Sequence, residues 1–277
     1  MMDDVLQYNG KRVIVSGAAS GMGAATAQIL VDLGAEVHAI DIKKPDVTGL
    51  ASYTECDLRD PEQIRATVAR IGKVVNALFN CAGVPNTFPN LDVMLVNFCG
   101  LRELTERVLE LMVEGAAVAS IASTAGIGWL QNAQTLMPLV LSPEYASARA
   151  WCEEHPKELA NAYGLSKEAI NAYTAYRSVA LAQQGIRINC LNPGPTDTPM
   201  MPEFEKAVGK RYMDEFPVPI GRHAVAGEQA WPLVFLNSPR ASYVTGQQLD
   251  ADGGFKAGLF TGQIDPSVLM PGGLAES

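Results

Sequence analysis

Two residues of this sequence, Tyr163 and Lys167, have the types and the spacing to move a proton. They lie four positions apart in the segment YGLSK, and residues four apart on a helix share one face. An unperturbed tyrosine loses its proton at about pH 10, and a neighbouring ammonium group favours the phenolate. We therefore expect Lys167 to lower the pKa of Tyr163 towards neutral pH, which makes Tyr163 a candidate general acid and base.

Two further polar residues precede this pair. Ser123 ends the apolar stretch AAVASIAS (116–123), where its hydroxyl can donate a hydrogen bond to a substrate oxygen, and Asn97 interrupts an apolar helical stretch. Taken alone, each has a structural explanation: a tyrosine usually packs, a serine after a strand usually caps or turns, and a mid-helix asparagine is usually solvated or at a kink. Their order in the chain favours a catalytic set of Asn97, Ser123, Tyr163 and Lys167.

Three glycines, Gly17, Gly21 and Gly23, lie where an apolar stretch ends and a helical pattern begins. Glycine lets the backbone turn sharply and approach a pyrophosphate, and the helix N-terminus offers unpaired N–H groups and a positive dipole end. The alternative is a glycine-rich turn without a ligand. The position directly after a strand favours a dinucleotide site.

Asp41 ends the next apolar stretch, 18 residues after Gly23. A carboxylate there accepts hydrogen bonds from the adenosine ribose hydroxyls and repels the 2′-phosphate of NADP. The turn itself, at residues 18–20, brings no cation. We therefore expect NAD in preference to NADP, although Lys43 and Lys44 point the other way, and an Asx turn is the structural alternative for Asp41.

The elements that must position these residues alternate between strands and helices. Asp60 and Pro61 form an N-cap and first-turn signal, and a kink is expected near Gly100. The expected strands are 11–17, 35–41, 74–83, 116–123, 186–194 and 247–254, and the expected helices are 23–34, 59–72, 91–115, 142–155, 165–185 and 228–238. This alternation predicts an α/β fold: one Rossmann-type doubly wound parallel sheet of about seven strands, with helices on both faces, over residues 1–277.

Composition excludes several classes of function. The 277 residues are 48% hydrophobic, which is enough for a buried core, and the net charge of −9 disfavours nucleic acids and anionic membrane surfaces as partners. No apolar run is long enough to span a bilayer and the N-terminus does not have the pattern of a signal peptide, so we expect a cytoplasmic protein. The five cysteines and three histidines are scattered, which predicts buried thiols and no metal site.

From Lys11 to Gly254 the chain resembles the classical short-chain dehydrogenase/reductases. The resemblance is carried by SGAASGMG (16–23), the CDL segment around Asp57, NCAG (80–83), Asn97, Ser123, YGLSK (163–167) and NPGPTDTP (192–199). It implies that Asp57 contacts adenine, that the NCAG segment supports the cofactor and the central sheet, and that Asn97 holds a water that relays protons to Lys167. It also implies that the proline, glycine and threonines after the strand at 186–194 hold the nicotinamide amide.

The cofactor-binding residues that follow from the glycine pattern and this resemblance form one set. They are Gly17, Ser20, Gly21, Met22, Gly23, Asp41, Ile42, Asp57, Leu58, Asn80, Ala82, Gly83, Tyr163, Lys167, Pro193, Gly194, Thr196 and Thr198.

One departure from the family pattern is the interval between Ser123 and Tyr163, which is 40 residues and wider than in most members. The extra segment, 129–160, includes the helical stretch 142–155 with Pro143 at a plausible first position. A wide interval resembles the 3α-hydroxysteroid dehydrogenase/carbonyl reductase and coniferyl-alcohol dehydrogenase-like subgroup. That resemblance implies that the insertion blocks a helix pairing used for tetramers, which favours a homodimer over a homotetramer; a simple packed helix is the alternative.

The expected reaction is hydride transfer between nicotinamide C4 and a small-molecule alcohol, ketone or aldehyde. We expect residues 199–221 to cover the substrate, and the methionines Met200 and Met201 indicate an apolar ligand such as a hydroxysteroid or aryl alcohol; a flexible surface loop is the alternative. Two other functions stay open: a carbonyl or acyl-chain ketone reductase using NADPH, and a catalytically silent NAD-sensing regulator. The regulator is disfavoured because such proteins usually lose the tyrosine or the lysine.

Overall fold

A parallel sheet forms the centre of the protein. The computed structural model describes residues 4–72 and 74–269, and within them the central sheet has seven strands, all paired in parallel, in the order β3-β2-β1-β4-β5-β6-β9. The strands are β1 (Arg12–Ser16), β2 (Glu36–Asp41), β3 (Ser52–Glu55), β4 (Val75–Asn80), β5 (Met112–Ile121), β6 (Arg187–Pro193) and β9 (Gln248–Ala251). The predicted doubly wound parallel sheet is confirmed. The predicted domain of 1–277 also includes residues 1–3, 73 and 270–277, which lie outside the described residues.

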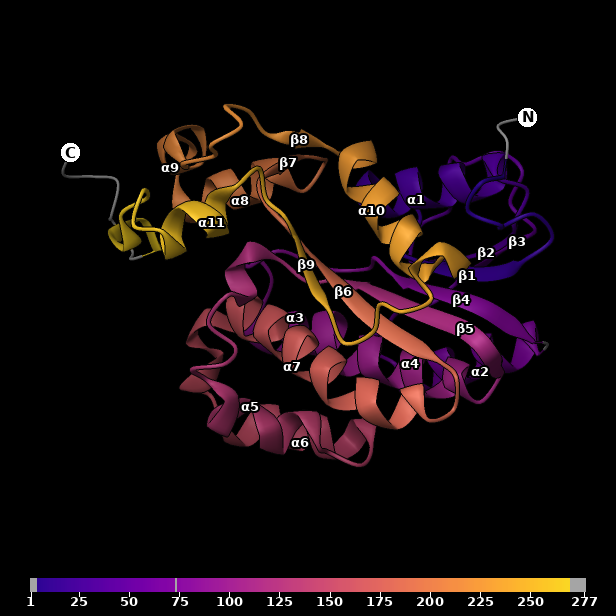
Figure 1. Cartoon of the computed structure of the whole chain (residues 1–277). Helices are drawn as coiled ribbons and strands as arrows, with labels where there is room; N and C mark the ends of the chain where they lie inside the picture. The colour runs from indigo at the N-terminus through magenta and orange to yellow at the C-terminus, as the bar shows by residue number, and fades with distance from the viewer. Residues whose placement is uncertain (1–3, 73, 270–277) are drawn as a thin grey trace.

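Helices cover both faces of this sheet (Figure 1). One face carries α1 (Gly21–Asp32) and α10 (Ala226–Asn237), and the other carries α2 (Pro61–Ile71), α3 (Asn90–Met94), α4 (Leu101–Leu109) and α7 (Ala162–Ala182). Both faces are buried, which is why the strands are almost continuously apolar. The Asp60 side chain accepts hydrogen bonds from the backbone N–H groups of Glu62 and Gln63, so the predicted cap of α2 is confirmed.

Two elements differ from the prediction. The sequence does not predict the short edge strand β3, because its residues, SYTE, lack the apolar run that marks the other strands. The helix expected over 91–115 divides into α3, a π-helical segment at Leu95–Gly100 and α4, and the chain is already in β5 at Met112. Pairing of Met112 with Val75 of β4 overrides the helical pattern there. The π-helical segment ends at Gly100, the position of the predicted kink, and a Cβ on Gly100 would lie 2.2 Å from the Leu58 carbonyl oxygen.

The insertion at 129–160 forms two helices, α5 (Ala133–Val140) and α6 (Tyr145–Glu154), on the outside of the α3/α7 layer (Figure 1). α5 packs against α7, and α6 packs against α3 and the π-helical segment. The sequence predicted only the second helix, because Pro138 lies inside α5 and proline disfavours a helix interior. The residue that caps α6 is Glu144, so Pro143 precedes the helix instead of starting it.

The segment at 199–221 is helical and not a flexible loop. It contains α8 (Met201–Val208) and α9 (Lys210–Glu215), and it lies between the two paired short strands β7 (Thr196–Asp197) and β8 (Ala224–Val225). With α11 (Phe255–Phe260) these helices gather at one end of the sheet, on the left of Figure 1. Among the described residues, no helix has the length and apolar character needed to cross a membrane.

Candidate active site

The glycine turn joins β1 to the N-terminus of α1, beside β4. Gly17 has a φ of 71°, and a Cβ there would lie 2.5 Å from backbone atoms of Ala82; a Cβ on Gly23 would lie 2.0 Å from the Gly17 carbonyl oxygen. Only glycine fits at either position. Ser20 is the N-cap residue of α1, but its side chain makes no capping hydrogen bond, so the first turn of the helix keeps its N–H groups for a ligand.

A cleft of about 520 Å³ opens beside this turn, where the strand order reverses between β1 and β4. Open α/β sheets bind ligands at such switch points. Most of the predicted cofactor residues line the cleft, namely Gly17, Ser20, Gly21, Met22, Gly23, Asp41, Ile42, Asp57, Leu58, Ala82, Gly83 and Thr198. The glycine cradle, the free helix N-terminus and the size of the cleft together fit a dinucleotide.

Asp41 connects the glycine turn to the end of β2. One carboxylate oxygen accepts a hydrogen bond from the Ala19 backbone N–H at 2.9 Å, and the other accepts one from the Lys43 N–H at 2.9 Å. The second contact forms an Asx turn, which is the structural role that the sequence offered as the alternative for Asp41. Each carboxylate oxygen still has acceptor capacity towards the cleft, since a carboxylate offers about four acceptor sites.

Asp57 also lines the cleft, and its carboxylate is held by Arg59. The Arg59 Nη2 lies 2.7 Å from Asp57 Oδ2, and hydrogen bonds from Arg59 hold the pKa of Asp57 below its ordinary value. Three cations line the cleft among the described residues: Lys43, Lys44 and Arg59. Arg59 also pairs with Asp92 at 3.1 Å, so its charge is already matched by two carboxylates.

Tyr163 and Lys167 share a face of α7, as their spacing predicted. The helix begins at Ala162, three residues before the expected start, after an Asn161 side chain that accepts a hydrogen bond from the Gly164 N–H at 3.2 Å. The Lys167 Nζ lies 5.5 Å from the centroid of the Tyr163 ring, and it donates a hydrogen bond to the Ile121 carbonyl at 3.0 Å. The four-residue spacing on α7 therefore brings the Lys167 ammonium group beside the Tyr163 ring, as the sequence predicted.

The predicted lowering of the Tyr163 pKa is not found in the protein's own electrostatics. Burial raises the pKa of Tyr163 to about 12, and a hydrogen bond with Ser123 only partly offsets this effect. Burial also lowers the pKa of Lys167 to about 8. The prediction considered the charge of the ammonium group but not the cost of removing both side chains from water.

Ser123 lies at the end of β5, at the N-cap of the short 3₁₀ turn Thr124–Gly126. Its hydroxyl oxygen accepts a hydrogen bond from the Ala125 N–H at 3.1 Å, which is the turn role expected for a serine after a strand. Its hydroxyl is also close enough to Tyr163 to lower the pKa of the phenol, against the effect of burial. The structure thus brings Ser123 and Tyr163 together despite the 40 residues between them.

Asn97 lies fully buried in the π-helical segment. Its side-chain amide pairs with the Val84 backbone in both directions: Oδ1 accepts from the Val84 N–H at 2.8 Å, and Nδ2 donates to the Val84 carbonyl at 3.0 Å. A Cβ on Gly83 would lie 3.3 Å from Asn97 Oδ1 and 3.8 Å from Lys167 Nζ, so both polar groups lie directly behind the cleft wall. The Asn97 side chain therefore braces the loop after β4.

Four predicted cofactor residues have other surroundings. Asn80 is buried and donates to the hydroxyls of Thr105 and Ser120, at 2.9 and 3.1 Å, so its side chain supports the sheet and not the cleft. Pro193 ends β6, while Gly194 lines a separate small cavity. The Thr196 hydroxyl donates to the Gly194 carbonyl at 2.9 Å. These positions support the segment that ends at Thr198, whose side chain would contact a Cβ on Gly21 at 3.4 Å.

The start of the segment 199–221 borders the cleft and makes contacts that the sequence did not reveal. Phe204 of α8 packs edge-on against Tyr163, with ring centroids 5.1 Å apart. Glu203 accepts a hydrogen bond from the Thr87 hydroxyl at 3.0 Å, which links α8 to the loop after β4. Met200 and Glu203 line the cleft. The helical spacing of Met200 and Phe204 was the only sequence signal that could have found this contact.

Two family models and several known proteins match most of this chain. A family model described as short chain dehydrogenase matches residues 11–134, and one described as Enoyl-(Acyl carrier protein) reductase matches residues 144–256. The chain is 30% identical over 250 residues to a coniferyl-alcohol dehydrogenase of Pseudomonas sp. strain HR199, covering 90% of this chain and 98% of that protein. It is 33% identical over 260 residues to a 3-alpha-hydroxysteroid dehydrogenase/carbonyl reductase of Comamonas testosteroni, covering 88% of this chain and 96% of that protein.

A solved structure has the same architecture. The 3-alpha-hydroxysteroid dehydrogenase from Pseudomonas sp. B-0831, complexed with NADH, superimposes with a TM-score of 0.75 at 28% identity, covering 92% of this chain and 100% of that one.

Proposed function

The chain belongs to the short-chain dehydrogenase/reductase family of oxidoreductases, and we propose that it interconverts an apolar secondary or aryl alcohol and the corresponding carbonyl compound with NAD. The observation that carries this proposal is the grouping of Tyr163, Ser123 and Lys167 beside the dinucleotide cleft. When bound, a nicotinamide cofactor supplies the acceptance and release of hydride at C4.

In this proposal, Tyr163 moves the proton at the substrate oxygen. It takes the proton of the alcohol during oxidation and returns it to the carbonyl oxygen during reduction. Ser123 lies beside Tyr163 and orients the same oxygen, and the Lys167 ammonium group lies 5.5 Å from the centroid of the Tyr163 ring. Asn97 holds the loop after β4, which lines the cleft, through two hydrogen bonds with the Val84 backbone.

The substrate class is inferred from the surroundings of Tyr163. Phe204 contacts the Tyr163 ring. Phe216 of the same segment packs against Phe255, with ring centroids 4.6 Å apart, so the segment contributes two packed aromatic side chains. The similar proteins act, by their names, on coniferyl alcohol and on 3-alpha-hydroxysteroids. The proposal is tested by screening steroid, benzylic and aliphatic alcohols for NADH fluorescence; failure of every alcohol and of the matching carbonyl compounds would contradict it.

Asp41 supports NAD as the cofactor, because its carboxylate at the end of β2 repels a 2′-phosphate, while Arg59 is occupied by two carboxylates. We expect NADH to bind more tightly than NADPH. The Asp41→Ala substitution should reduce the ratio of the two affinities by about 10-fold, the scale of one charged contact. Fluorescence titration of both cofactors measures this. NADPH binding as tightly as NADH to the unmodified protein would instead assign the ribose site to Lys43 or Lys44.

For assembly we propose a homodimer. The insertion packs on α7 of its own subunit, whereas Trp231 and Phe235 of α10 and Leu249 of β9 are 39%, 41% and 38% exposed. Light scattering should give twice the chain mass of 29.6 kDa. Phe235→Asp should dissociate this dimer, and Val179→Asp, on the outer face of α7 and 68% exposed, should not. A tetramer, or dissociation by Val179→Asp alone, would place the interface on α7.

A further inference from the structure

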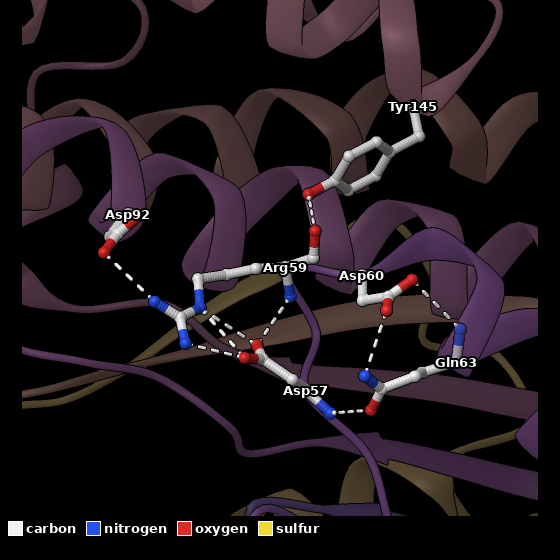
Figure 2. A network of polar contacts seen from close by, with 6 residues as sticks. All are labelled: Asp57, Arg59, Asp60, Gln63, Asp92 and Tyr145. Carbon is white, nitrogen blue, oxygen red and sulfur yellow. Dashed lines mark hydrogen bonds and ion pairs between the residues drawn. The ribbon is translucent and has the colours of Figure 1, made fainter.

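The insertion at 129–160 contacts the wall of the cofactor cleft through one hydrogen bond (Figure 2). Tyr145, the first residue of α6, donates its hydroxyl hydrogen to the Arg59 carbonyl at 2.7 Å. The Tyr145 side chain is only 2% exposed, and burial raises its pKa, so the hydroxyl stays protonated and remains a donor at working pH. The backbone of Arg59 is therefore fixed from the side of the insertion.

The side chain of Arg59 spans the two walls of the cleft. Its Nε and Nη2 bind the Asp57 carboxylate at 3.0 to 3.1 Å and 2.7 Å, and its Nη1 binds Asp92 Oδ2 at 3.1 Å. Asp57 lies in the connection from β3 to α2, and Asp92 lies on α3. All three residues line the cleft, so the guanidinium ties one wall to the other. Without it, the two carboxylates would face each other as like charges.

The loop that carries Arg59 is held from the side of α2 as well. The Asp57 N–H donates to Gln63 Oε1 at 3.0 Å, and Gln63 Nε2 donates to Asp60 at 3.0 Å (Figure 2). Tyr145 contacts the loop from the opposite side, through the Arg59 carbonyl. The loop is therefore clamped between α2 and the insertion.

This clamp lies at the adenosine end of the cleft. The Cys56 N–H donates to the Asp41 carbonyl at 3.1 Å, so residues 56–59 run beside the end of β2. In doubly wound folds an acidic residue at that strand end holds the adenosine ribose, while the pyrophosphate lies at the glycine turn. The network drawn in Figure 2 thus lies where the adenosine half of a dinucleotide would bind.

We infer that the insertion serves cofactor binding: Tyr145 positions Arg59, and Arg59 closes the cleft over the adenosine half of the dinucleotide by binding Asp57 and Asp92 together. The inference rests on the proposed function, because it requires a dinucleotide in the cleft. It assigns the insertion a role in affinity for the adenosine half and none in the chemical step.

Three ligands and two variants test this inference. We expect Tyr145→Phe and Asp92→Asn each to weaken binding of NADH and of ADP-ribose by about 3- to 10-fold, the range of one hydrogen bond or ion pair, measured by fluorescence and calorimetric titration. Reduced nicotinamide mononucleotide, which lacks the adenosine, should bind equally to the unmodified protein and both variants.

The double variant shows whether the two substitutions weaken binding through the same residue, Arg59, or independently of each other. If both act through Arg59, the double variant should bind ADP-ribose more tightly than the product of the two single effects predicts. The matched control is Ser142→Ala, whose hydroxyl donates a hydrogen bond to the Pro138 carbonyl inside the insertion. This control should change none of the three affinities.

The outcomes distinguish the inference from the proposed function. Unchanged ADP-ribose affinity in both variants, or an equal loss for reduced nicotinamide mononucleotide, overturns the inference while the proposed function stands. An unmodified protein that binds neither NADH nor ADP-ribose overturns both. Thermal unfolding checks that the variants fold, and Asp92→Asn, at a partly exposed side chain, keeps the test valid if Tyr145→Phe does not fold.

Discussion

Replacing Tyr163 with phenylalanine should lower kcat by at least about 10²-fold, the usual contribution of a general acid–base group. The substitution removes the proton that passes to and from the substrate oxygen, while the ring keeps its contact with Phe204 at 5.1 Å. Affinity for NADH should stay unchanged, because the cleft is lined by other residues. Steady-state kinetics with the best alcohol of the screen, together with NADH titration, measures both effects.

The pH dependence gives a second readout of the same residue. A pKa raised to about 12 means that the protein's own groups keep Tyr163 protonated at neutral pH. The protonated form can donate to a carbonyl, but it must lose its proton before it can accept one from an alcohol. Alcohol oxidation should therefore rise with pH over the range below that pKa, while carbonyl reduction should not, and the rise should vanish in Tyr163→Phe.

The matched control for this prediction is Tyr176→Phe, on the same helix but half-exposed to solvent. It should leave kcat and its pH dependence unchanged. Near wild-type turnover by Tyr163→Phe on any good substrate would show that another group moves the proton.

Gly23→Ala should weaken NADH binding by about 10- to 100-fold. The added methyl would lie 2.0 Å from the Gly17 carbonyl oxygen, so the turn that receives the pyrophosphate must move. Overpacking of this kind costs about 1–3 kcal/mol, which converts to that range when the strain is relieved by distorting the site. NADH titration measures the affinity, and thermal unfolding shows whether the strain also destabilises the fold.

Gly227→Ala is the control for this substitution. Gly227 lies in α10, where an added Cβ has no neighbour within 4 Å, so alanine should preserve NADH affinity and stabilise the helix slightly. If Gly23→Ala bound NADH as tightly as Gly227→Ala, the glycine turn would not be the pyrophosphate site.

Local spacing was enough to predict much of the site. Tyr163 and Lys167 are one helical turn apart, so any helix over them brings the two side chains to one face. The glycines after β1 and the aspartate at the end of β2 follow the strand–turn–helix order, and that order also predicted the parallel sheet. Each of these features depends on neighbours along the chain, and a pattern of neighbours can be read from the sequence.

Contacts between distant segments decided the rest. The end of the helix over 91–115 depends on pairing of Met112 with Val75, and the pKa of Tyr163 depends on burial by elements far along the chain. Tyr145 meets Arg59 across 86 residues, and Arg59 meets Asp92 across 33. No periodicity links such positions, since helical and strand patterns extend over a single element. Only the tertiary structure could show that the insertion contacts the cofactor cleft.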